Sequence, residues 1–339
     1  MDNFEDRFSE IKKQYIPITT VEGFIYPPKF VKPEQTTNIW LRSFMSLAAY
    51  LLLGYYIFPS YKILLLITVI IIIHEMGHFF AMKFFHYKDL GMFFIPLLGA
   101  YVTGTKRDVS QKESAIILLA GPLPGIIIGL IFYFFFANDN RLSLVGLSYE
   151  TISLSFIILN LVNLLPVYPL DGGQLLNRVF LEEDSWVSKI FVFLSIGLLI
   201  WVALFGFSKP FYPLLLFPLM MILRMFGDSK LKTLEKKIEH SAIDMDKSYE
   251  DLTDEDYWKI RNIIITEHSS FSDIAPAPPY EYSEKEEKIM TTIQSLLHRH
   301  LIQDLSIGVK IFILILWSGA FAAPWFLDIY QTILSRFGY

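Results

Sequence analysis

The sequence predicts an all-α polytopic membrane protein with about six to seven transmembrane helices and a small cytoplasmic helical region. Three observations lead to this fold class. Hydrophobic residues make up 53% of the 339 residues and charged residues only 19%, against about 25% charged residues in a typical soluble domain. Several apolar stretches approach the ~20 residues that a helix needs to cross a bilayer. Residues 227–304 are polar and charged, which predicts a soluble region.

Seven apolar segments are expected to form the spanning helices. The sixth is short and contains Pro213 and Pro218, so a kinked or re-entrant helix is an alternative there. The segments are Ile39–Phe58, Ile63–Phe85, Ala115–Ala137, Ile152–Leu170, Val187–Phe207, Pro210–Phe226 and Ile307–Phe326.

These segments divide the chain into four parts. Residues 1–38 form an N-terminal segment, 39–226 a transmembrane core, 227–304 the soluble region, and 305–339 a last transmembrane helix and tail. Within the soluble region we expect two helices separated by a proline-rich linker. They are Lys230–His240 and Glu284–His300, the second introduced by a capping box of Ser283 and Glu286.

Loop charge predicts the orientation. With seven spans, most lysines and arginines fall on one side of the membrane, and the other side receives little more than Lys62, Arg141, Lys209 and Arg336. The positive-inside rule therefore places the N-terminus and residues 227–304 in the cytoplasm. For residues 227–304 this cytoplasmic placement holds only if the sixth segment crosses the membrane completely.

Composition excludes several classes of site. The chain has no cysteine, which excludes a disulfide framework, a thiolate metal site and a thiol nucleophile. A net charge of −5 gives no indication of a nucleic-acid surface. Residues 1–14 are polar and acidic, unlike a cleavable signal peptide.

The second apolar segment carries His74, Glu75 and His78, three ionisable residues at membrane depth. Each costs at least a few kcal/mol there. The histidines are four residues apart and share one helix face, so two imidazoles can hold one Zn²⁺ while Glu75 acts as general base on a metal-bound water. The alternative is a structural cluster in which histidine pairs with glutamate to stabilise helix packing.

A third metal ligand is expected from the distant stretch NLLPVYPLDGG. There Asp171 ends the fourth segment, after Pro166 and Pro169, where the backbone unwinds. Such backbone is tolerated in a membrane only where it is buried in protein or lines a wet cavity. An ordinary loop turn is the alternative. Asp89 and Glu113 follow the histidine helix in a loop, where a solvated charge is the expected role.

The two stretches together resemble the site-2 protease family of intramembrane zinc metalloproteases. The resemblance rests on residues 74–78, HEMGH, and on residues 163–172, which run from an asparagine through two prolines to LDG. It implies that His74, His78 and Asp171 bind zinc and that Glu75 is the catalytic base. By the same resemblance, Asn163 and Asn160 position the substrate or stabilise the oxyanion.

Residues 91–106 also resemble the membrane-dipping β segment of this family. An exposed strand edge would hold a substrate extended after its helix unwinds, and Gly99 and Ala100 are expected to contact it. An amphipathic interfacial loop is the alternative. Residues 120–125, AGPLPG, indicate tight helix packing.

The resemblance implies a zinc-dependent intramembrane endopeptidase that cuts membrane-protein substrates within or near their transmembrane segments, in regulated intramembrane proteolysis. Its partners would be a transmembrane substrate and the lipid bilayer, and residues 227–304 would bind a regulatory partner or a second subunit. Two alternatives remain: a transporter or channel with a histidine–glutamate pathway for protons or metal, and a catalytically silent relative that binds membrane proteins.

Overall fold

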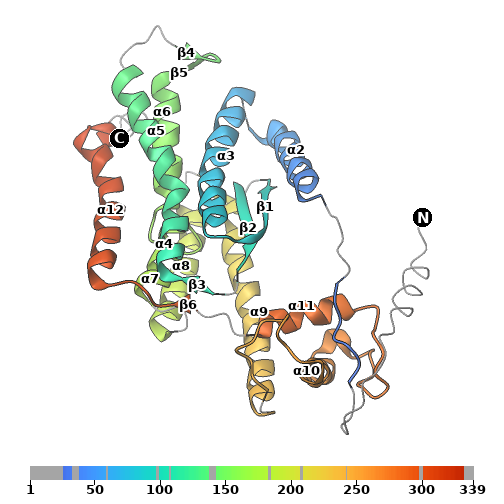
Figure 1. The fold of residues 1–339 in the computed structure, drawn as a ribbon. Coiled ribbons are helices and arrows are strands. Elements are labelled where there is room, and N and C mark those ends of the chain that lie inside the picture. Colours follow the sequence, from blue (N-terminus) through green and yellow to red (C-terminus); the bar gives the residue numbers. More distant parts are fainter. Residues whose placement is uncertain are drawn as a thin grey trace. The chain divides into compact units, whose positions relative to one another are not determined.

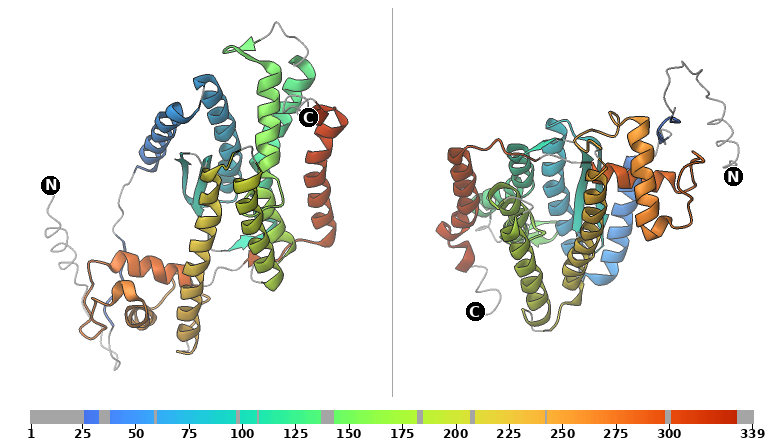
Figure 2. Two further views of the ribbon diagram at one scale, coloured as in Figure 1. Left: turned by 180° about the vertical axis from the view of Figure 1, so that it is seen from behind. Right: turned by 90° about the horizontal axis from the view of Figure 1, so that it is seen from below.

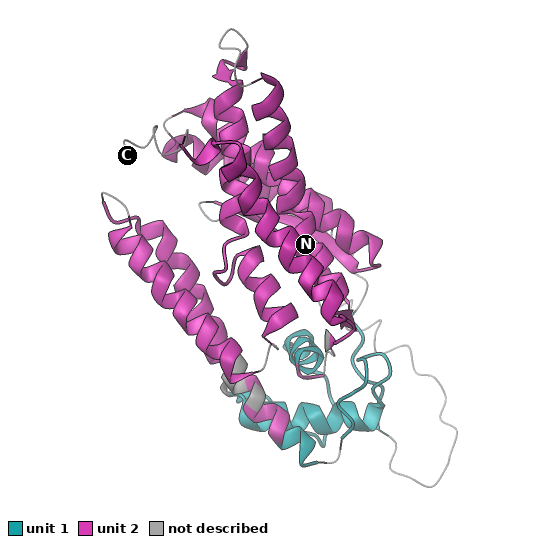
Figure 3. Ribbon diagram, turned by 90° about the vertical axis from the view of Figure 1, so that its left-hand side faces the viewer, with its two compact units in different colours: residues 1–32, 237–295 teal, residues 33–236, 296–339 magenta. Residues whose placement is uncertain are grey.

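The computed structural model describes residues 26–32, 38–58, 60–96, 99–106, 108–136, 143–181, 185–206, 209–241, 243–297 and 301–331 (Figure 1). The chain divides into two compact units (Figure 3). Unit 1 comprises residues 1–32 and 237–295, and unit 2 comprises residues 33–236 and 296–339. The expected division at residue 226 falls inside a continuous helix.

Unit 2 is a bundle of helices with the β-hairpin of β1 (Lys88–Ile95) and β2 (Gly99–Thr105) beside it (Figures 1 and 2). Its helices are α2 (Ile39–Ile57), α3 (Tyr61–Phe84), α4 (Gln111–Ala120), α5 (Pro122–Phe136), α6 (Tyr149–Asn163), α7 (Asp171–Phe180), α8 (Trp186–Phe205), η1 (Tyr212–Leu215), α9 (Leu216–Glu239) and α12 (Ile307–Phe326). The last three residues of α9 are assigned to unit 1. Its other strands are β3 (Val109–Ser110), β4 (Ser143–Leu144), β5 (Leu147–Ser148) and β6 (Leu301–Ile302). The short strands β4 and β5 form a second antiparallel pair, and β3 and β6 form a parallel one.

Four stretches of the described chain are long and apolar enough to cross a membrane, which makes this an integral membrane protein with fewer clear spans than the expected six to seven. They are Tyr61–Phe84, Gln111–Phe136, Trp186–Phe205 and Ile307–Phe326. The second consists of α4 and α5 in succession, separated by a single turn residue, Gly121.

The fourth expected segment, Ile152–Leu170, is shorter as a helix than predicted. Helix α6 ends at Asn163, after 15 residues, because Pro166 and Pro169 cannot continue an α-helix. Residues 164–170 form a non-helical turn. Asp171 is therefore the first residue of a separate helix, α7, and does not end the fourth segment as expected.

The sixth expected segment, Pro210–Phe226, is not a separate helix. It begins as the 3₁₀ turn η1 and continues into α9, which runs without a break to Glu239. Pro218 is tolerated because it lies in the first turn, where backbone N–H groups have no helical partner. The polar half continues as helix because Leu234 and Ile238 recur four residues apart and are buried. The expected helix Lys230–His240 is the end of α9.

The β segment expected over residues 91–106 is the antiparallel hairpin of β1 and β2. Strand β1 packs against α2, and β2 packs against α3. The amide N–H of Phe94 in β1 donates to Ser46 Oγ of α2 at 3.1 Å. The outer edge of β1 is therefore covered by α2.

The core of unit 2 lies between α4, α5, α6, α7 and α12. Ile157, Leu164 and Leu175 are at its centre and are fully buried. Trp317 of α12 donates its indole N–H to the carbonyl oxygen of Leu164 at 2.9 Å. This core supports the turn that leads to Asp171.

Unit 1 contains α10 (Asp254–Glu267), η2 (Ser269–Phe271) and α11 (Glu286–Leu296). Helix α11 corresponds to the expected Glu284–His300, of which residues 298–300 lie outside the described residues. The sequence analysis missed α10, although Thr253 is an N-cap that accepts from Asp256 N at 3.1 Å and the first turn is acidic, both of which are helix-start signals.

A buried ion pair links these two helices. Arg261 of α10 donates to Glu286 of α11 from Nε at 2.7 Å and from Nη2 at 3.0 Å, and Tyr257 donates its hydroxyl to the same carboxylate. Ser283 N also donates to Glu286 Oε2 at 2.9 Å, which forms the carboxylate half of the expected capping box. Burial alone would raise the pKa of Glu286, but the hydrogen bonds from Arg261, Ser283 and Tyr257 lower it.

We predict that Arg261→Ala destabilises unit 1 by about 3–5 kcal/mol, because it leaves a buried carboxylate uncompensated. Lys259→Ala is the control, since its pair with Glu255 is exposed and should change stability by less than about 1 kcal/mol. Hydrogen exchange of α10 and α11 measures both. The contribution of Glu286 is present above pH 4.5, its ordinary pKa, and is lost as pH falls through the lowered value. Equal protection in the two variants would contradict this account.

Candidate metal centre

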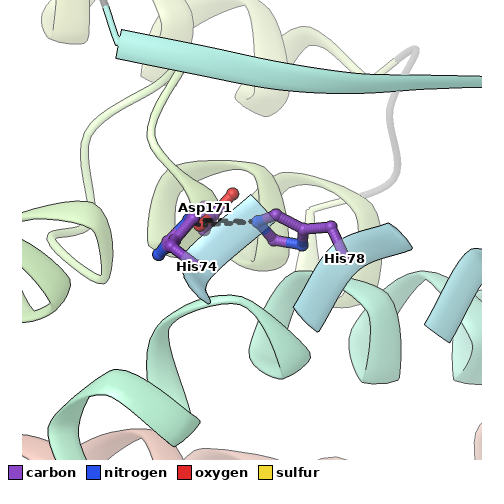
Figure 4. A group of neighbouring side chains, drawn as sticks. All are labelled: His74, His78 and Asp171. Carbon is purple, nitrogen blue, oxygen red and sulfur yellow. Dashed lines mark hydrogen bonds and ion pairs between the residues drawn. The ribbon is translucent and has the colours of Figure 1, made fainter. Parts of the chain in front are cut away.

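The two histidines of α3 point to one place inside the bundle (Figure 4). His74 and His78 are 7% and 8% exposed, and their Nε2 atoms are 3.1 Å apart. The four-residue spacing puts them one turn apart on one helix face. Glu75, which lies three residues before His78 on the same helix, is also buried.

Asp171 reaches the histidines from α7 (Figure 4). Its Oδ2 lies 3.0 Å from His74 Nε2 and 3.3 Å from His78 Nε2. The turn before it is tightly folded: a Cβ added to Gly172 would lie 1.9 Å from the carbonyl oxygen of Leu164, so this position excludes any larger residue. The sequence prediction that these three side chains meet agrees with the structure.

Hydrogen bonds on the opposite ring nitrogens fix both histidine tautomers. His78 Nδ1 lies 2.7 Å from the carbonyl oxygen of Ile117, which can only accept, so Nδ1 carries the proton. His74 Nδ1 lies 2.9 Å from Asn160 Oδ1. The amide N–H of Asn160 donates to Phe156 O at 2.8 Å, which fixes its oxygen toward His74. In the neutral rings each Nε2 therefore carries a lone pair.

Three hydrogen-bond acceptors thus converge. Asp171 Oδ2 is buried and has no donor in hydrogen-bonding geometry, although two imidazole nitrogens lie beside it. Such an arrangement is unfavourable unless a cation lies between the three atoms. The edge of a tetrahedron with zinc–ligand distances of about 2.0–2.1 Å is roughly 3.3 Å, and the three separations are 3.0, 3.1 and 3.3 Å. The residues therefore fit zinc, and this is the single such group of histidine and carboxylate residues within the described chain.

Glycines allow the helices around this group to approach closely. A Cβ on Gly121, between α4 and α5, would lie 2.3 Å from His78 Nε2, and one on Gly77 would lie 1.9 Å from Ala120 O. A Cβ on Gly125 would lie 2.2 Å from Asn160 Nδ2. The tight packing expected for residues 120–125 therefore brings Gly121 against His78 and Gly125 against Asn160, the hydrogen-bond partner of His74.

The residues expected to contact substrate lie in different surroundings. Asn160 is 1% exposed, and its two amide atoms contact His74 Nδ1 and Phe156 O. Asn163 is half-buried at the end of α6 and donates to Leu159 O at 3.3 Å. Gly99 and Ala100 are half-buried at the start of β2. None of the four belongs to the group of His74, His78 and Asp171.

Sequence reasoning missed the carbonyl oxygen of Ile117, because a backbone acceptor has no residue-type signal. It also missed the contact between Asn160 and His74. The available signal was a polar residue within an apolar helix three residues before Asn163, but the side-chain partner of such a residue cannot be read from spacing.

Known proteins resemble part of this chain. The profile of Peptidase family M50 matches residues 62–145. A zinc metalloprotease of Methanocaldococcus jannaschii, MJ0392, is 29% identical over 138 residues, which cover 39% of this chain and 38% of the relative. Stage IV sporulation protein FB of Bacillus subtilis is 32% identical over 126 residues, 36% of this chain and 41% of the relative. The matches thus span about two fifths of each relative.

A comparison of structures gives a solved match to a site-2 protease from Methanocaldococcus jannaschii, with a TM-score of 0.39 and 25% identity. It covers 53% of this chain and 84% of the solved one.

We predict that Asn160→Ala weakens zinc affinity about 10–100-fold, the usual cost of losing a hydrogen-bond partner of a metal-binding histidine. Asn163→Ala is the matched control, three residues along the same helix and outside the metal group. Competition with a chelator measures both affinities. Equal zinc affinity in the two variants would exclude the positioning role of Asn160.

We also predict that Gly121→Ala abolishes stoichiometric zinc binding, because the added methyl group overlaps the imidazole of His78. Gly197→Ala and Gly319→Ala are controls in α8 and α12, where an added Cβ meets nothing within 4 Å. Metal content of the purified proteins is the readout. Retention of a full equivalent of zinc by Gly121→Ala would show that His78 is not held where the structure has it.

Proposed function

Because this chain belongs to the site-2 protease family of M50 peptidases, we propose that it is a zinc-dependent intramembrane endopeptidase. The observation that carries the proposal is the convergence of two tautomer-fixed imidazoles and one carboxylate beside Glu75, on a helix apolar enough to span a membrane. The substrates are membrane proteins cut within or near a transmembrane segment, in regulated intramembrane proteolysis.

In this proposal each residue has one task. His74, His78 and Asp171 hold zinc, which when bound polarises the scissile carbonyl group and lowers the pKa of water. The carboxylate of Glu75 accepts a proton from the attacking water and transfers it to the leaving amine. Asn160 and the carbonyl group of Ile117 keep the two imidazoles in the tautomers that expose Nε2.

The hairpin supports a way of holding the substrate extended. Since the Phe94 N–H points to α2, its pair with Ala100 is of the non-hydrogen-bonded kind, so Ala100 directs its own N–H and C=O away from β1. Val102, two residues on, does the same. Among the described residues no other element hydrogen-bonds to the backbone of β2. This edge, next to the histidine helix, is where we propose that an unwound substrate segment pairs.

The N-terminus and residues 227–304 are proposed to be cytoplasmic, on the basis of loop charge. Because the chain has no cysteine, single introduced cysteines report sidedness directly. Glu255→Cys in α10 should react with an impermeant thiol reagent only from the cytoplasmic side, and Leu144→Cys in β4 only from the other side. Labelling of Glu255→Cys from outside intact cells would reverse the orientation.

We predict that Glu75→Gln retains stoichiometric zinc and loses about 10²–10⁴-fold in the rate of cleavage of a synthetic transmembrane substrate, because the general base is gone. Zinc-dependent cleavage by the wild type distinguishes the protease from a transporter and from a silent relative. Undiminished cleavage by Glu75→Gln would exclude the assigned role of Glu75. Absence of cleavage by zinc-loaded wild type, with every substrate tried, would favour the silent relative.

A second prediction concerns the open edge of β2. Val102→Pro removes one outward N–H and is tolerated at a strand edge, so cleavage should fall at least about tenfold while zinc content stays unchanged. Val102→Thr keeps the N–H and the branched side chain and serves as the control. Equal cleavage rates in the two variants would exclude substrate pairing at this edge.

A further inference from the structure

Residues 26–32, with the sequence YPPKFVK, lie in unit 1 without regular secondary structure. They are more than 200 residues away along the chain from the residues they contact. The contacts are made with the segment before α10, with α10 itself, with the loop that leads to α11, and with α11. The segment therefore binds unit 1 as a continuous extended peptide.

Aromatic side chains donate hydrogen bonds to the backbone carbonyl groups of this peptide. Trp258 donates its indole N–H to Pro27 O at 2.8 Å, and Tyr249 donates its hydroxyl to Phe30 O at 2.6 Å. Tyr282 donates its hydroxyl to the carbonyl oxygen of Pro28. Trp258 and Tyr282 are stacked, with ring centroids 5.7 Å apart and planes at 10°. Grooves lined with aromatic side chains are a recurrent way in which proteins bind proline-rich peptides.

One side chain of the peptide is recognised with particular detail. Lys29 donates its ammonium group to the carbonyl oxygens of Glu250 and Leu252, both at 2.6 Å, and its Nζ lies 5.8 Å from the centre of the Tyr249 ring. Its backbone N–H donates to Asp254 Oδ1 at 2.8 Å. Neutral residues cannot replace these charge-assisted bonds.

Aromatic and charged contacts flank this lysine. The ring of Phe30 lies 5.5 Å from that of Tyr282, edge to face, and Lys32 forms an exposed ion pair with Glu287. Unit 1 therefore contacts two prolines, a lysine and an aromatic residue in succession.

The peptide is not part of the core of unit 1. None of its seven side chains is buried. The buried residues of the unit come from 237–295, among them Tyr257, Ile260, Ile264 and Ile289, each 0% exposed. Residues 26–32 thus contribute half-buried and exposed side chains at the periphery of the unit, as a bound peptide does, and none to its buried centre.

We propose that unit 1 is a receptor for extended peptides of the pattern Pro-Pro-Lys-aromatic, that residues 26–32 are its intramolecular ligand, and that a partner protein with a segment of the same chemistry displaces them. The proposal does not depend on the protease activity. Tethering gives the internal ligand an effective concentration of the order of millimolar, so an external peptide binds well only when the internal one is weakened.

The test uses the full-length protein in detergent micelles and a fluorescent peptide of residues 26–32 with blocked ends. A variant with Pro27→Ala, Lys29→Ala and Phe30→Ala frees the receptor and should bind the peptide at least tenfold more tightly than wild type. Adding Tyr249→Phe and Tyr282→Phe to this variant removes two donors and should reverse that gain, whereas adding the control Tyr212→Phe, in η1 of unit 2, should not. A peptide with alanine in place of lysine should bind at least tenfold more weakly.

Absence of peptide binding to the freed variant, with α10 and α11 still protected from hydrogen exchange, would overturn the proposal. A second experiment decides the matter if that variant unfolds. A protease site placed within residues 33–37 of the otherwise unchanged chain allows the N-terminal segment to be cut after folding. An excess of the 26–32 peptide should then release the cut segment. Retention of the segment at millimolar peptide would show that it is an integral part of unit 1.

Discussion

The two hydrogen bonds on the Nδ1 atoms of His74 and His78 are the constraint on which the site depends. They use the ring protons for Asn160 and Ile117, so both Nε2 lone pairs face Asp171 Oδ2 and each other. Acceptors placed this close repel one another unless a cation joins them. A bound cation would in turn join α3 to α7, which meet through Asp171 and two histidines that lie 93 and 97 positions before it along the chain. Metal binding and folding are then coupled.

Close backbone approach is the second requirement, and it explains why the helices around the site are interrupted. Gly77 and Gly121 let α3 contact the junction of α4 and α5, and Gly172 lets α7 begin against the turn at Leu164. Non-helical backbone is tolerated at membrane depth only where protein covers it or where it lines a wet cavity. Leu164, at the start of the turn, meets this condition, because it is fully buried and its carbonyl oxygen accepts from Trp317. Helix α12, outside the segments that carry the motifs, thus supports the approach to Asp171.

Much of the site could be predicted from the sequence because its signals are residue types in places that exclude them. Histidine and glutamate inside an apolar helix, and an aspartate after two prolines, each demand a partner, and His74, His78 and Asp171 do meet. The ends of the helices were predicted less well: α6 stops at Asn163, and α9 continues through the apparent boundary at Phe226. Hydropathy reports burial in lipid or protein alike, so it cannot separate a span from a broken helix. The contacts of Ile117 O and Asn160 depend on tertiary packing, which spacing does not encode. The expected contacts of Gly99, Ala100, Asn160 and Asn163 with substrate stay predictions.

The most direct test of the central claim is X-ray absorption at the zinc edge of the purified full-length protein. The account predicts one zinc per chain in a shell of nitrogen and oxygen only, with the outer scattering of two imidazole rings, since two histidines and one aspartate supply the ligands. A zinc-free protein after purification in zinc-containing buffer would contradict it. So would a shell with one imidazole or three, because the tautomers of His74 and His78 assign two nitrogens and no more.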